Sequence, residues 1–104
     1  MITVNVYTDK NVVNEIFVSG HASYDVKGKD IVCSAVSTAV MLSANLVERV
    51  CPKYIFESDE DKVQIRLKII ESNEMSNIVM ENLVRCLEDI SETYGKYIKI
   101  KFMK

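Results

Sequence analysis

The sequence predicts an α+β fold, a two-layer sandwich in which a mixed five-stranded sheet carries two helices on one face, in the order β-β-α-β-β-α-β. Two observations predict it. Five short segments have the composition of strands, and three of them alternate apolar and polar residues with the period of two that is typical of a half-buried strand. Two longer segments lack this alternation and have the length and composition of helices. Because each strand has one apolar face, the helices are expected to pack on that face.

The first half of the chain predicts a hairpin followed by a helix. Residues 2–8 read ITVNVYT and alternate strictly, residues 9–11 read DKN and have turn chemistry, and residues 12–20 are rich in β-forming residues. We expect a connection of about three to five residues between these two strands. Residues 30–50 are too long for a strand and dense in small residues. They predict a helix that is buried on most of its surface and stops at Pro52.

The second half predicts another hairpin, a second helix and a final strand. A short strand follows Pro52 and leads through an acidic turn at 58–61 into residues 63–69, in which apolar and polar side chains alternate. Residues 73–94 predict an amphipathic helix, and residues 97–104 alternate again. The predicted apolar stripe of this helix consists of Met75, Val79, Leu83, Cys86, Leu87, Ile90 and Tyr94.

Composition predicts one globular domain, residues 1–104, with a single core. The chain is 48% hydrophobic and 27% charged, which is ordinary for a folded protein. Its formal net charge of −2 gives no overall positive field, so we expect no direct binding of nucleic acid. We see no secretory signal, and the apolar segment 31–47 carries several serines, unlike a membrane span. We therefore expect a soluble cytoplasmic protein without a membrane partner.

The chain has three cysteines, Cys33, Cys51 and Cys86, at wide spacing. An odd number without an export signal argues against a disulfide framework, so we expect thiols. A structural zinc site needs four ligands, usually in close pairs, and the sequence offers three cysteines and one histidine with no such pair. We expect no metal and no cofactor, and we assign structural roles to Cys51 and Cys86.

Residues 20–35, GHASYDVKGKDIVCSA, gather the groups that a cysteine nucleophile needs. Asp30 stands where it can cap the first helix, and Cys33 falls in the first turn, where the helix dipole and unpaired N–H groups lower a thiol pKa. His21 precedes a loop of eight residues, 22–29, which is long enough to bring the imidazole to the thiol as general base and acid. Residue types alone leave the alternatives open that Cys33 is a small buried hydrophobe and Asp30 only a cap.

The same stretch closely resembles the signature of the Prp family of ribosomal-processing cysteine proteases. The matching residues are Gly20-His21-Ala22, Gly28 and DIVCSAVS at 30–37, and the resemblance spans essentially the whole chain. Proteins of that family are small bacterial homodimers that remove an N-terminal extension from large-subunit ribosomal protein L-twenty-seven. The resemblance therefore implies a single cysteine protease domain, a homodimer, and the L-twenty-seven precursor as substrate.

The resemblance also implies the roles of individual residues. Cys33 would be the nucleophile and His21 the general base and acid. Supporting roles would fall to Gly20, Asp30 and Ser37, and substrate contacts to Tyr24, Gly28 and Ser34. The residues between His21 and Asp30 match the mobile loop of the family. Asp25 and Ser34 depart from the residues common there, a small apolar residue and an alanine.

The residues and the resemblance leave three candidate functions. The leading one is a cysteine endopeptidase that works through a thiolate and an acyl-enzyme. A thiol hydrolase of small esters could use the same dyad. The non-enzymatic alternative is a dimeric ribosome-associated or RNA-associated module that binds through the polar face of the sheet. That face is predicted to carry Lys62, Arg66, Lys68, Lys99 and Lys101 with Tyr7 and Tyr97.

Overall fold

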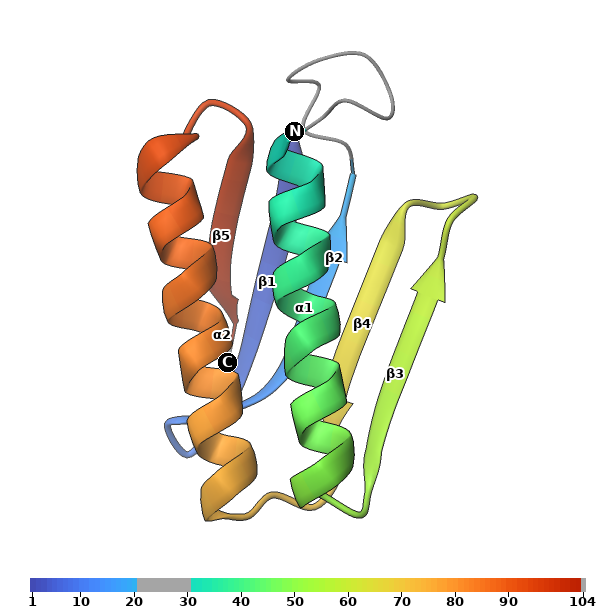
Figure 1. Cartoon of the computed structure of the whole chain (residues 1–104). Coiled ribbons are helices and arrows are strands. Elements are labelled where there is room, and N and C mark those ends of the chain that lie inside the picture. Colours follow the sequence, from blue (N-terminus) through green and yellow to red (C-terminus); the bar gives the residue numbers. More distant parts are fainter. Residues whose placement is uncertain (21–30, 104) are drawn as a thin grey trace.

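The computed structural model describes residues 1–20 and 31–103, which form one sheet with two helices packed on one face (Figure 1). The strands are β1 (Ile2–Asp9), β2 (Val12–Ser19), β3 (Tyr54–Asp59), β4 (Gln64–Ile69) and β5 (Ile98–Met103), and the helices are α1 (Ile31–Val50) and α2 (Glu74–Thr93). The predicted α+β class and the order β-β-α-β-β-α-β are confirmed.

The sheet has the order β3-β4-β2-β1-β5. β1 and β5 pair in parallel and the other neighbours pair antiparallel, so the sheet is mixed as predicted. The alternation in β1 buries Ile2, Val4 and Val6 toward the helices, each at most 1% exposed. Leu67 of β4 and Ile98 of β5 point to the same core.

The hairpin between β1 and β2 turns more tightly than the sequence predicts. Only Lys10 and Asn11 separate the strands, with φ angles of 53° and 67°. The expected connection of about three to five residues is wrong. Two consecutive residues at positive φ give a turn whose twist matches the twist of the flanking strands, which favours the two-residue form.

Helix α1 is an amphipathic core helix and is not buried on most of its surface, so that expectation is wrong. Its inner side, which includes Val36 and Val40, is buried against the sheet, whereas Leu42 is 61% exposed. In a two-layer fold the outer side of a helix has no layer above it. By length and apolar composition α1 could cross a membrane. Core helices of soluble proteins share these two properties, and the inner side of α1 belongs to the core of this fold.

Helix α2 begins at a capping box in which Asn73 and Ser76 exchange hydrogen bonds, 2.8 and 2.9 Å long. The predicted stripe is correct at Leu83 and Leu87, which are buried. It is wrong at Met75 and Cys86, which are exposed. The buried side is centred on a neighbouring line of residues that also includes Ser76, Met80 and Val84.

The β3–β4 hairpin lies at an edge of the sheet. The turn comprises residues 60–63, so residues 58 and 59 belong to β3 and the predicted turn at 58–61 begins two residues too early. Val63 lies in this turn at φ 53°, a conformation that is rare for a β-branched residue. Phe56 of β3 pairs with the buried Leu67 yet remains 38% exposed, because β3 extends beyond the cover of the helices.

Candidate active site

A cavity of about 370 Å³ lies between α1, the end of β2 and the β3–β4 hairpin. Figure 1 shows the start of α1 and the β3–β4 turn at the same end of the sheet. Cys33, Ser37 and Met41 line the cavity from the helix, and their spacing of four residues places them along one side of it. Val63 and Ile65 line it from the hairpin.

Cys33 is the third residue of α1 and is half-buried against the core. In the first turn of a helix the backbone N–H groups lack helical acceptors, and the helix dipole favours a negative charge. Ser37 is half-buried one turn further along and lines the same cavity, and its supporting role stays a prediction. Ser34 is exposed and is not part of the cavity lining, so its substrate contact stays a prediction.

Gly20 fixes the end of β2 at the edge of this cavity. Its φ is +90°, and a Cβ atom there would lie 2.5 Å from the backbone oxygen of Met1. The position therefore requires glycine on both conformational and steric grounds. The Gly20 N–H donates a hydrogen bond of 3.1 Å to the carbonyl oxygen of Val63, which ties the end of β2 to the hairpin turn.

Four of the predicted site residues, His21, Tyr24, Gly28 and Asp30, lie outside the described residues, so their roles stay predictions. Gly20, which directly precedes His21 in the sequence, lines the same cavity as Cys33.

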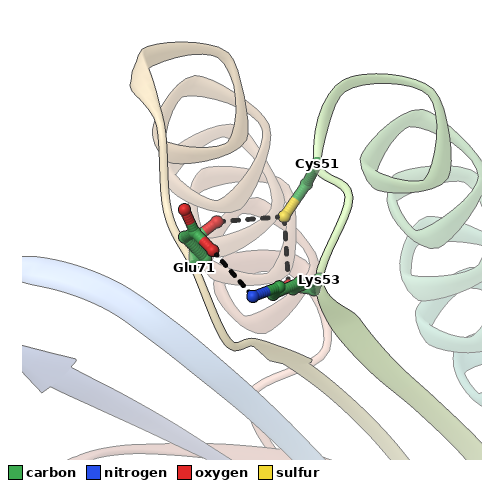
Figure 2. Close-up of polar contacts among 3 residues, drawn as sticks. All are labelled: Cys51, Lys53 and Glu71. Carbon is green, nitrogen blue, oxygen red and sulfur yellow. Dashed lines mark hydrogen bonds and ion pairs between the residues drawn. The ribbon is translucent and has the colours of Figure 1, made fainter.

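The other two cysteines lie elsewhere. Cys51 is 2% exposed, and its single S–H donor is shared between the carbonyl oxygens of Lys53 and Glu71, each 3.3 Å from Sγ (Figure 2). The side chains of Lys53 and Glu71 form a 3.4 Å ion pair. The structural role predicted for Cys51 agrees with these contacts. Cys86 is exposed on α2. Neither residue lines the cavity, so Cys33 is the cysteine placed there.

Most of the described residues that line the cavity were not anticipated as site residues, among them Met41, Asp59, Glu60 and Val63. The sequence shows the acidic run at 57–61 plainly. Nothing local links that run to Cys33, because tertiary packing brings the β3–β4 hairpin to the start of α1. A helical projection of α1 could have found Met41, which lies two turns after Cys33.

Comparison with known proteins decides the family. The model of the family described as Cysteine protease Prp matches residues 1–99. The chain belongs to this family. The resemblance stated from the sequence is confirmed, and the chain is a cysteine protease, a hydrolase. The non-enzymatic alternative is set aside.

Two curated relatives and several solved structures extend the match. Ribosomal processing cysteine protease Prp from two strains of Staphylococcus aureus is 26% identical over 98% of this chain and 99% of the relative. The S. aureus Prp structure with a covalently linked product peptide has a TM-score of 0.91 at 23% identity, covering 99% of this chain and 100% of that one. SMU.848 from Streptococcus mutans has a TM-score of 0.87 at 26% identity, covering 99% of this chain and 94% of that one.

Proposed function

We propose that this Prp family member is a cytoplasmic endopeptidase that removes the N-terminal extension of ribosomal protein L-twenty-seven during ribosome assembly. One observation carries the proposal: Cys33 of this cysteine protease lies in the first turn of α1 and lines a cavity. Two relatives are named ribosomal processing proteases, and one S. aureus Prp structure holds a substrate peptide.

The proposed reaction uses two residues. His21 takes the proton of the Cys33 thiol, and the thiolate attacks the scissile carbonyl carbon. Backbone N–H groups at the start of α1, including that of Cys33, stabilise the oxyanion. The imidazolium then gives its proton to the leaving amine, and water attacks the thioester to release the acid and restore the thiol. Gly20 supports this arrangement by fixing where the chain leaves β2.

The test is cleavage of the L-twenty-seven precursor, followed by mass spectrometry of the new N-terminus. We expect wild-type protein to cut once, and Cys33→Ala and His21→Ala to lose at least about a thousandfold in rate. Cys86→Ala is the matched control and should cut normally, because Cys86 is exposed on α2 away from the cavity. Undiminished cleavage by Cys33→Ala would overturn the proposed nucleophile. Faster turnover of small activated esters than of the precursor would favour the small-ester hydrolase.

We also propose that the protein is a homodimer, as the resemblance to the family implies. The apolar side chains exposed on the outer side of the helix layer support a second copy as partner. Leu42, Leu46, Met75 and Ile78 are between 42% and 61% exposed. Exposed apolar patches on a folded chain are typical of protein interfaces.

A further inference from the structure

The charged residues that line the cavity beside Cys33, among those described, are all acidic. Among the described residues that line it, Asp59 and Glu60 carry carboxylates and none is a lysine, arginine or histidine. Both acidic residues are exposed, at the point where β3 passes into the turn. The carboxylates therefore stand at the solvent side of a cavity whose helix side holds the nucleophile.

The rest of the lining is mainly apolar. Val36 and Met41 face the cavity from α1, and Val63 and Ile65 face it from the hairpin. A lysine or arginine side chain matches this arrangement, because its aliphatic stem packs on apolar surface while its charged end stays near solvent. A neutral apolar side chain would also pack on these walls, and the two exposed carboxylates add a preference for a side chain with a cationic end.

Among residues 1–20 and 31–103, the cations next to the β3–β4 hairpin do not line the Cys33 cavity. Arg66 forms a 3.1 Å ion pair with Glu15, and its guanidinium lies 4.9 Å from the centre of the Phe17 ring. Lys62 lines a neighbouring cavity with Glu57, Asp59 and Arg66, and it does not line the one that holds Cys33. In the part of the chain that the structure describes, ion pairs engage Glu15 and Glu71 but neither acidic residue of the cavity.

Asp59 is held in place for such a role. Its Oδ1 accepts a hydrogen bond of 3.1 Å from the backbone N–H of Lys62, which closes the turn. A carboxylate has about four acceptor positions, so Oδ2 and the remaining lone pair of Oδ1 stay available for a cationic group. Charge-assisted hydrogen bonds to such a carboxylate are stronger than neutral ones.

We propose that Asp59 and Glu60 are specificity-determining residues, which select substrates with a lysine or arginine close to the scissile bond. This inference rests on the proposed function of the same cavity. A ribosomal protein is suited to it, because proteins that bind RNA neutralise phosphates with lysine and arginine. The two carboxylates would act on substrate capture, so their removal should raise KM and leave kcat nearly unchanged.

The experiment uses the full chain and two synthetic peptides that span the processing site of the L-twenty-seven precursor. One peptide carries lysine at the positions that flank the scissile bond, and the other has norleucine at the same positions. The test variant is Asp59→Asn/Glu60→Gln, in which the amide oxygen introduced at position 59 can still accept a hydrogen bond from the Lys62 N–H. The control is Glu88→Gln/Asp89→Asn, which removes the same charge from exposed positions of α2.

We expect the test variant to lose up to about fivefold in kcat/KM with the basic peptide, which corresponds to about 1 kcal/mol, the upper end of what an exposed ion pair contributes. Its rate with the norleucine peptide, and both rates of the control, should match wild type. Added salt should narrow the difference between wild type and the test variant. An equal loss with both peptides, an equal loss in the control, or no loss at all would overturn the inference. If wild type cuts neither peptide, the proposed function itself fails.

Discussion

At the scale of single residues, Gly20 occupies a position that does not accommodate a side chain. A Cβ atom there would meet the Met1 carbonyl oxygen at 2.5 Å, and φ is +90°. We expect Gly20→Ala to lower the free energy of unfolding by about 1–3 kcal/mol, because both strain and a backbone clash oppose it. Urea denaturation measures the change.

Gly95→Ala is the control for this prediction. Gly95 does not have a positive φ, and an added Cβ would lie 3.1 Å from the Ser91 backbone oxygen, a milder contact than the one at Gly20. We expect it to change the free energy of unfolding by less than about 1 kcal/mol. If both alanine variants had the same stability, the special role of Gly20 would be refuted.

Cys51 gives a second prediction at the residue scale. Its buried Sγ is within hydrogen-bond distance of the carbonyl oxygens of Lys53 and Glu71 (Figure 2). These contacts link the segment after α1 to the segment after β4. Cys51→Ala removes these contacts and should lower the free energy of unfolding by about 1–3 kcal/mol. Cys86→Ala at the exposed position should lie within about 0.5 kcal/mol of wild type. Thermal unfolding compares the two, and equal melting temperatures would contradict the prediction.

The candidate site divides at this scale into what spacing can predict and what it cannot. Cys33 and Ser37 follow from local rules, because residues four apart share a side of a helix. Gly20 also follows from sequence, as the end of a β-rich run. Asp59 and Glu60 do not follow, since the packing of the β3–β4 hairpin beside α1 is tertiary and leaves no local pattern.

At the scale of elements, Asn73 joins the ends of the two helices. Its Oδ1 caps α2 by accepting from the Ser76 N–H at 2.8 Å, and its Nδ2 donates to the carbonyl oxygen of Val50 at 2.7 Å, at the end of α1. We expect Asn73→Ala to lower the free energy of unfolding by about 1–2 kcal/mol, at the upper end of cap substitutions, because both contacts are lost. Chemical denaturation measures this loss.

Asn73→Asp separates the two contacts of this cap. The aspartate keeps the acceptor for the Ser76 N–H and favours the positive end of the helix dipole, but it cannot donate to Val50. Its stability should therefore fall between wild type and Asn73→Ala. A value as low as that of Asn73→Ala would mean that the link to α1, not the cap, carries the stability.

The elements themselves are largely predictable where their periodicity is strong. The alternation in β1 and the apolar side of α2 give strands and helices at nearly the observed residues. The errors have physical causes. Composition shows that α1 is apolar, but the number of layers decides how much of it is buried. At the borders of the α2 stripe, Met75 and Cys86 lie far enough round the helix to reach solvent.

At the scale of the whole molecule, a two-layer fold leaves the outer side of both helices uncovered, and the proposed homodimer would cover it. Met75 and Ile78 of α2 are each 54% exposed. We expect Met75→Glu/Ile78→Glu to remain folded by circular dichroism but to sediment as a monomer at micromolar concentration. Phe102→Glu changes a 59% exposed residue of β5 and should stay dimeric. Sedimentation of the wild type as a monomer would refute the homodimer. If only Phe102→Glu sedimented as a monomer, the interface would lie at the edge strand β5 instead.

Catalysis should survive this dissociation. The Cys33 cavity is lined by residues of α1, β1, the end of β2 and the β3–β4 hairpin, and α2, which carries both substitutions, contributes none of the described lining residues. A monomer therefore keeps the nucleophile, Gly20 and the two acidic residues in the same relation. We expect Met75→Glu/Ile78→Glu to cleave the basic peptide with kcat/KM within about twofold of wild type at a concentration where it is monomeric, which is within the effect of an ordinary surface substitution. A rate that fell in proportion to the dimer fraction would instead show that the second copy completes the site.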